Sequence, residues 1–144
     1  MRFLRNKDGN VSKKVWFALA YNICFTIIAG AVFSVFIINK KSFIWVPDGL
    51  QQHFNALLYY RSWLLSIIDT LITEHRLSVP LWDMHIGLGS DVLTTLHYYV
   101  IGDPLNPLSV FVPDEKYMEL FYNAMVLVRI YFAGLAFSAY CRYH

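Results

Sequence analysis

The sequence has little charge: only 15% of its 144 residues are Asp, Glu, Lys or Arg, whereas 57% are hydrophobic. Soluble domains carry about 25% charged residues, so the composition excludes a typical water-soluble globular protein and favours a membrane protein. Cysteine is also scarce, with Cys24 inside one long apolar run and Cys141 at the end of another. Neither is placed to form a disulfide in an oxidising compartment, which excludes a disulfide-stapled secreted domain.

Several functional motifs are missing as well. The sequence contains no glycine-rich phosphate loop, hydrolase elbow or dinucleotide-binding fingerprint. His75, His85 and His97 lack the spacing of a zinc site and have no cysteine near them, so the sequence predicts no metal site. The basic N-terminal tail is interpreted as a topology signal and a partner for anionic lipid, and no nucleic-acid partner is expected.

Two long apolar runs are present. Residues 15–38 contain no charged residue and, at about 1.5 Å per residue, span roughly 36 Å, enough to cross a hydrocarbon core of about 30 Å. We predict a transmembrane helix there; a cleaved signal peptide is the alternative, but secretory apolar segments are only about 7–15 residues long. Residues 117–140 form a second predicted transmembrane helix, with Glu119 near its start and Arg129 near its middle.

The charges around the first run predict its orientation. The basic residues before the run are Arg2, Arg5, Lys7, Lys13 and Lys14, and those just after it are Lys40 and Lys41. The positive-inside rule therefore places residues 1–14, a basic tail, in the cytoplasm. Two crossings return residues 141–144 to the cytoplasm and leave residues 39–116 as an extracytoplasmic loop. The predicted fold class is an all-α membrane protein with two transmembrane helices flanking a large external loop.

The external loop is expected to be folded. All five prolines lie in it and divide it into segments. Apolar residues recur at helical spacing over residues 49–73, which predicts an amphipathic helix lying along the outer membrane surface. The Gly- and Pro-rich stretch that follows predicts tight turns around one short helix, over roughly residues 90–100, and its aromatic residues suit a polar–apolar boundary.

The stretch VPDGLQQHF contains the first candidate site residues. Asp48 precedes an apolar periodic run and is followed three residues later by Gln51, the pattern of a helix N-cap with a capping partner. A catalytic role can coexist with capping, because one carboxylate oxygen can accept backbone N–H bonds while the other faces a substrate. Gln52 and His53 are either the solvated first turn of a helix or ligands for sugar hydroxyls or phosphate.

Four further polar residues are candidates for binding a ligand or for a structural role. Arg61 can bind phosphate through its guanidinium or reach lipid head groups. Asp91 is either a second site carboxylate or a helix cap after the GLGSD turn, and Asp103, before a proline, is expected in a turn. Arg129 lies at mid-membrane, where a charge usually faces a partner, so it either binds lipid phosphate or forms a structural ion pair.

Four motifs occur in order along the chain: PDGLQQHF, YYRSWL, VPLWDMHIGLGSDVL and HYYVIGDPLNPLS. Together they resemble the N-terminal region of the YfhO family of bacterial membrane proteins, large multi-spanning proteins similar in architecture to protein mannosyltransferases and oligosaccharyltransferases. The resemblance covers the chain from the first apolar run to the second and implies the N-terminal part of a type C glycosyltransferase-like fold in the bacterial cytoplasmic membrane. Because family members have many more spans, we expect this chain to be part of a longer protein and to be inactive by itself.

The resemblance also implies a reaction, in which a polyprenyl-phosphate-linked sugar is moved at the outer membrane face to a lipid or a cell-envelope polymer such as teichoic acid. Asp48 would activate the acceptor hydroxyl or hold a divalent metal, although the residues themselves imply no cofactor. A carboxylate near a low-dielectric boundary can act as such a base. The candidate substrate-binding residues are Gln52, His53, Arg61, Asp91 and Arg129. The alternatives are a non-catalytic two-span binding or assembly protein and a transporter of lipid-linked sugars.

Overall fold

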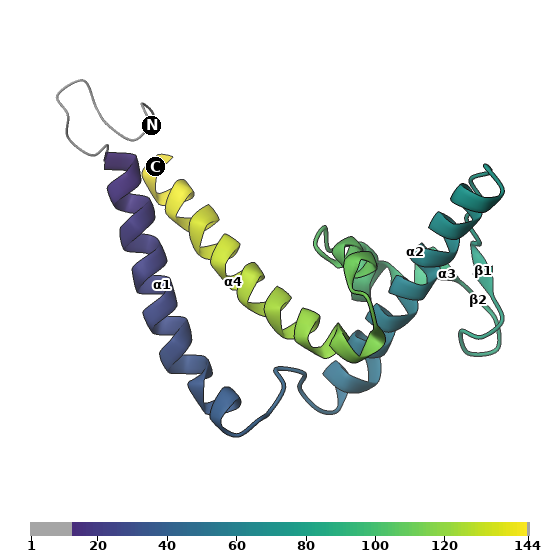
Figure 1. Cartoon of the computed structure of the whole chain (residues 1–144), viewed down its shortest axis with the longest axis horizontal. Helices are drawn as coiled ribbons and strands as arrows, with labels where there is room; N and C mark the ends of the chain where they lie inside the picture. Colours follow the sequence, from purple (N-terminus) through teal and green to yellow (C-terminus); the bar gives the residue numbers. More distant parts are fainter. Residues whose placement is uncertain (1–12, 144) are drawn as a thin grey trace. The chain divides into compact units, whose positions relative to one another are not determined.

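The computed structural model describes residues 13–143 (Figure 1). Most of the predicted basic tail, including Arg2, Arg5 and Lys7, lies outside the described residues. The chain divides into two compact units. We call Ser42–Val128 the loop unit, and the described residues of Met1–Lys41 and Arg129–His144 the helix-pair unit.

Two long apolar helices dominate the secondary structure. Helix α1 covers Lys13–Ile38 and helix α4 covers Met118–Tyr143. Both are long and apolar enough to cross a membrane, and no residue of α1 is buried. A helix that is apolar on all sides and uncovered by protein suits lipid better than water. The predicted fold class, an all-α membrane protein with two spanning helices, is confirmed.

Tyrosines join the two helices within the helix-pair unit. The hydroxyl of Tyr21 donates to the backbone carbonyl of Tyr131 at 2.7 Å, and the hydroxyl of Tyr131 donates to the side-chain oxygen of Asn22 at 3.1 Å. The rings of Tyr21 and Phe25 pack edge-on against Tyr131, with centroid distances of 5.2 and 5.1 Å. Gly134 lets Tyr21 approach closely, since a Cβ there would clash with the tyrosine hydroxyl. Close packing and such polar contacts hold helices together in lipid, where hydrophobic burial contributes little.

The loop unit contains eight shorter elements besides the start of α4. The π-helical turn η2 (Gly49–Phe54) continues into α2 (Asn55–Thr73), and the strands β1 (Trp82–Asp83) and β2 (Ser90–Asp91) follow. The remaining elements are α3 (Val92–Leu96), the π-helical turn η3 (His97–Ile101) and the 3₁₀ turns η4 (Asn106–Phe111) and η5 (Glu115–Tyr117). The strands pair antiparallel, with Trp82 opposite Asp91 and Asp83 opposite Ser90. Two-residue strands are too short to show an alternating pattern, so the sequence did not predict them.

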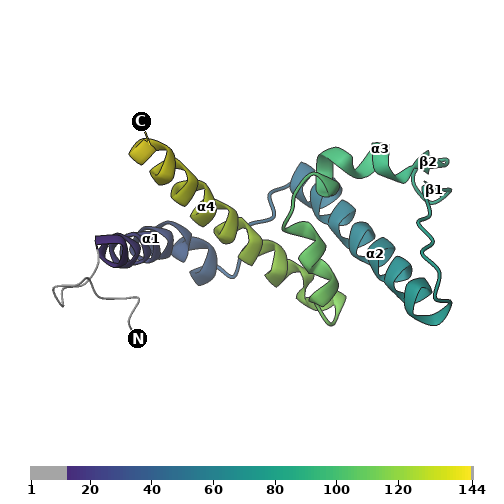
Figure 2. The ribbon, with the colours of Figure 1, turned by 90° about the horizontal axis from the view of Figure 1, so that it is seen from above.

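The hydrophobic core of the loop unit lies between α2 and the elements that follow it, and α3 lies beside α2 in both views of the ribbon (Figures 1 and 2). Its buried residues are Leu57, Tyr60, Val92, Leu96, Val100, Val112 and Met118. One face of the predicted amphipathic helix, at Leu57 and Tyr60, is therefore covered by protein. Ile68, Leu71 and Ile72, near the end of α2, stay exposed. Contact of this helix with the outer membrane surface stays a prediction.

The turn between β1 and β2 contains two glycines with different requirements. Gly87 has φ +62° and a Cβ there would meet nothing within 4 Å, whereas Gly89 has φ +107° and a Cβ there would lie 2.9 Å from the sulfur of Met84. We expect Gly89→Ala to destabilise this turn by about 1–3 kcal/mol and Gly87→Ala by only about 1 kcal/mol. Amide hydrogen exchange at Val92, whose N–H donates to the Leu81 carbonyl beside the strand pair, measures the effect. Equal effects of the two substitutions would contradict this prediction.

Candidate functional site

Asp48 lies half-buried directly before η2. Its backbone is already helical, with φ −69° and ψ −37°, and its side chain makes no hydrogen bond to the helix that follows. The predicted N-cap is therefore wrong, because an N-cap residue has an extended backbone from which its side chain reaches the first N–H groups. Carbonyl groups further upstream satisfy those N–H groups: Leu50 donates to Trp45 and Gln51 donates to Pro47. The carboxylate of Asp48 therefore forms no capping hydrogen bond with η2.

The residue after Asp48 is a glycine because an indole ring occupies the space beside it. Gly49 is buried, and a Cβ at this position would lie 2.7 Å from Cδ1 of Trp45. The ring of Trp45 lies 6.4 Å from the ring of His53, measured between centroids. The chain therefore folds back at Trp45, and the indole ring lies beside both Gly49, the first residue of η2, and His53 in the same element.

The π-helical form of η2 determines which side chains share a face. A π-helical turn closes hydrogen bonds between residues five apart and is wider than an α-helical turn. Residues four and five positions after Asp48 therefore lie near its side of the helix, and these are Gln52 and His53. Single π-helical turns are frequent at functional sites.

Two tyrosines from η3 complete this group. The hydroxyl of Tyr99 donates to Oε1 of Gln52 at 3.0 Å. The ring of His53 lies 5.2 Å from the ring of Tyr99 and 6.3 Å from that of Tyr98, and Tyr98 is 74% exposed. The sequence alone places these tyrosines only at a polar–apolar boundary. The one available signal was their position in the fourth motif, HYYVIGDPLNPLS, because nothing local links that motif to Gln52.

Arg61 is enclosed in the loop unit. Its side chain comes from α2, only 8% of the residue is exposed, and Nη2 donates to the backbone carbonyl of Val112 at 2.7 Å. Its Nε is buried and has no hydrogen-bond partner among the described residues. The observed contact joins α2 to the end of η4. Substrate binding by Arg61 stays a prediction.

Asp91 and Asp103 both have structural roles. Oδ1 of Asp91 accepts a hydrogen bond from the backbone N–H of Thr94 at 2.6 Å, which caps α3 and lowers the pKa of Asp91. Oδ1 of Asp103 accepts from the N–H of Leu105 at 2.8 Å, as expected in a turn. The cap and the turn are confirmed, whereas substrate binding by Asp91 stays a prediction. Arg129 lies half-buried on α4 in the helix-pair unit, and its role also stays a prediction.

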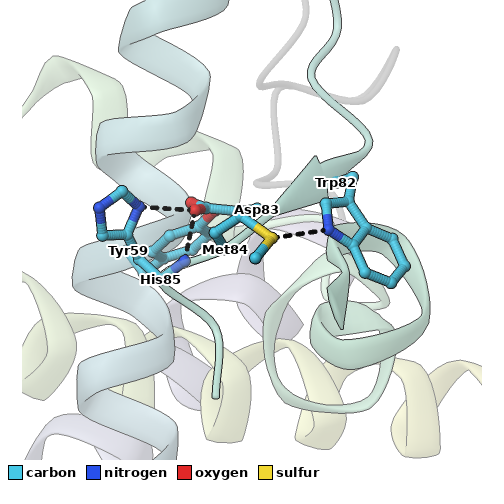
Figure 3. Close-up of polar contacts among 5 residues, drawn as sticks. All are labelled: Tyr59, Trp82, Asp83, Met84 and His85. Carbon is cyan, nitrogen blue, oxygen red and sulfur yellow. Dashed lines mark hydrogen bonds and ion pairs between the residues drawn. The ribbon is translucent and has the colours of Figure 1, made fainter. Parts of the chain in front are cut away.

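A second polar cluster surrounds Asp83, a residue to which the sequence alone assigns no role. Figure 3 shows Tyr59 and His85 both directed at its carboxylate. Oδ2 of Asp83 accepts from the Tyr59 hydroxyl at 2.5 Å, and Oδ1 lies 2.8 Å from both the backbone nitrogen and Nδ1 of His85. The hydrogen bonds from Tyr59 and then His85 lower the pKa of Asp83 to about 2. Burial, and next the hydrogen bond to Asp83, raise the pKa of Tyr59 to about 12.

The Tyr59–Asp83 contact has a predicted pH window. The folded-state pKa of Asp83 lies below its ordinary value. The ionised carboxylate therefore stabilises the fold fully above about pH 4, and this contribution is lost as the pH falls toward 2. The folded-state pKa of Tyr59 lies above its ordinary value. The protonated phenol therefore stabilises the fold fully below about pH 10, and this contribution is lost as the pH rises toward 12. A tyrosine phenol changes its ultraviolet absorbance when it ionises. We therefore expect the difference in absorbance between wild type and Tyr59→Phe, which reports Tyr59 alone, to change with a midpoint near pH 12. A midpoint near pH 10 would show that the contact does not form.

The described residues contain no group of three or more His, Cys, Asp or Glu side chains arranged to hold a metal ion. Cys24 and Cys141 are free thiols. The contacts at η2 bring together an amide, an imidazole and two phenols, and the carboxylate of Asp48 lies one helical turn before the amide and the imidazole. Such a set can accept a proton and can form hydrogen bonds with a hydroxylated ligand.

Comparison with known proteins gives one match. The sequence profile of a family described as bacterial membrane protein YfhO matches residues 20–144. No curated protein and no solved structure matches the chain. The matched residues include both of the polar groups described above, the one at η2 and the one around Asp83.

Proposed function

Because the chain belongs to the YfhO family of bacterial membrane proteins, we propose that it forms the N-terminal part of an integral membrane glycosyltransferase. The enzyme moves a sugar from a polyprenyl-phosphate donor to a cell-envelope acceptor at the outer face of the cytoplasmic membrane. In this arrangement the N-terminus is cytoplasmic and the loop unit is external. The observation that carries the proposal is the uncommitted carboxylate of Asp48, which follows a spanning helix and shares a helix face with Gln52 and His53.

Asp48 is the proposed general base. An acceptor hydroxyl attacks the anomeric carbon of the donor sugar, and the bond between that carbon and the phosphate oxygen breaks. Polyprenyl phosphate leaves with the bonding electrons, and the hydroxyl proton passes to Asp48. A carboxylate that caps a helix is stabilised as an anion by backbone N–H groups and is a weaker base for that reason. Asp48 makes no such hydrogen bond, which supports its assignment as a base.

The side chains around Asp48 are proposed to bind the sugar. The amide of Gln52 and the imidazole of His53 can form hydrogen bonds with sugar hydroxyls, and the exposed ring of Tyr98 offers a flat apolar surface. Tyr99 positions Gln52 through its hydroxyl. Arg61 is proposed to act indirectly, because its guanidinium holds α2 to Val112.

The test of this proposal follows a labelled sugar in membranes that contain the protein as it occurs in its source. The donor is a polyprenyl phosphate carrying a radiolabelled sugar, and the measurement is the label recovered in cell-envelope polymer and in other lipids. We expect protein-dependent transfer of label to one of these acceptors. Label that reaches the outer face but stays on the donor lipid would support a transporter. Label that neither reaches an acceptor nor moves to the outer face would support a binding or assembly role.

A further inference from the structure

A pocket lies along α2, away from Asp48. It has a volume of about 260 Å³ and is lined by Tyr59, Ser62, Trp63, Ser66, Pro80, Trp82 and Asp83. Tyr59 lies more than two helical turns further along the continuous segment of η2 and α2 than Asp48. A sugar at the proposed transfer site therefore does not fill this pocket.

The polar atoms that line this pocket are mainly hydrogen-bond acceptors. The hydroxyls of Ser62 and Ser66 donate to carbonyl groups of α2 at 3.2 and 2.8 Å, and the Tyr59 hydroxyl donates to Asp83. Each hydroxyl has used its only hydrogen and keeps lone pairs for a ligand. The Asp83 carboxylate receives hydrogen bonds from Tyr59 and His85 and still has room for about one more of its four possible bonds. The pocket thus suits a ligand that donates hydroxyl hydrogens, and the negative charge of Asp83 disfavours an anion.

Two tryptophans supply the apolar walls. The indole N–H of Trp63 donates to the carbonyl of Pro80 at 2.8 Å, and the indole N–H of Trp82 faces the sulfur of Met84 at 3.3 Å (Figure 3). Gly89 makes the second arrangement possible, because a Cβ there would lie 3.3 Å from the indole nitrogen of Trp82. Since both N–H groups are engaged within the protein, the two rings offer carbon faces to a ligand. Trp82 is 62% exposed and therefore accessible.

We propose that this pocket binds one neutral pyranose ring, as a subsite separate from the transfer site. A pyranose has C–H groups that pack on an aromatic face and hydroxyls that donate to a carboxylate. The volume is below the range of about 300–1,000 Å³ that is usual for drug-sized ligands, which suits a single ring. The proposal depends on the residues of this pocket and on none at η2, so it can be tested without donor lipid.

The experiment is saturation-transfer difference NMR on the full chain in lipid nanodiscs, which avoids sugar-headed detergents that would occupy the pocket. The probes are the methyl glycosides of glucose, galactose and mannose, with glucose 1-phosphate as an anionic probe. We expect saturable binding of at least one methyl glycoside. Trp82→Ala and Asp83→Asn should each weaken it by about tenfold or more, the effect of losing one strong contact of about 1.4 kcal/mol.

Matched variants separate a local effect from a general one. Asp69→Asn makes the same chemical change as Asp83→Asn at an exposed position on α2, and Phe111→Ala removes an aromatic ring that is 79% exposed. Neither should change the affinity. If Asp83→Asn disturbs folding, Trp82→Ala decides the question, because most of that side chain is exposed. The proposal is overturned if no methyl glycoside binds saturably, if Trp82→Ala binds as wild type does, or if glucose 1-phosphate binds more tightly than the neutral glycosides.

Discussion

Replacing Asp48 with asparagine is expected to reduce the rate of sugar transfer by at least about 100-fold, the usual contribution of a general base. Asparagine has nearly the same shape as aspartate but cannot take the proton of the acceptor hydroxyl. Because the Asp48 side chain makes no hydrogen bond to η2, the substitution should leave insertion and folding unchanged. Asp48→Glu keeps the carboxylate on a longer side chain and should retain more activity than Asp48→Asn.

The measurement is the initial rate of label transfer at saturating donor, together with the donor concentration that gives half the maximal rate. Loss of a base lowers the maximal rate and leaves the half-saturating concentration nearly constant. Asp69→Asn is the matched control, because it changes an exposed aspartate on the same continuous helical segment. Wild-type transfer by Asp48→Asn would exclude Asp48 as the base. A transporter would also tolerate this substitution, since moving a lipid across a membrane needs no proton acceptor.

Replacing Arg61 with alanine is expected to destabilise the loop unit by about 3 kcal/mol. The substitution removes a buried side chain from the middle of α2 and leaves the Val112 carbonyl without its charged donor. Arg61→Met should cost less, because methionine fills most of the volume and removes the buried charge altogether. The measurement is denaturant unfolding in nanodiscs, followed by tryptophan fluorescence.

Arg76→Ala is the control for Arg61→Ala. Arg76 forms an ion pair with Glu74 at 2.8 Å, but both side chains are more than half exposed. Exposed ion pairs contribute about 0–1 kcal/mol, so this substitution should have little effect. If Arg61→Ala is no more destabilising than Arg76→Ala, the guanidinium does not support the fold, and phosphate binding becomes the better explanation of Arg61.

Local patterns were sufficient for some of the candidate residues. Asp91 and Asp103 each form a hydrogen bond with a backbone N–H two or three residues further on, so the short stretches around them were enough to predict a cap and a turn. Asp48 has the same local pattern but a different structure. Its chain neighbours fold around Trp45, and the backbone of Asp48 is already helical directly before η2 begins at Gly49. A capping motif in the sequence does not reveal such an upstream contact.

The sequence by itself determined that this is a membrane protein with two spanning helices. A predominantly apolar run long enough to cross a bilayer is a property of consecutive residues, and lipid accepts such a single segment only as a helix. Tertiary structure alone decided which polar side chains meet. Tyr99 reaches Gln52, Tyr59 reaches Asp83, and Arg61 reaches Val112 across long stretches of chain. These contacts depend on how α2 packs against the elements that follow it, and periodicity along the chain carries no information about that packing.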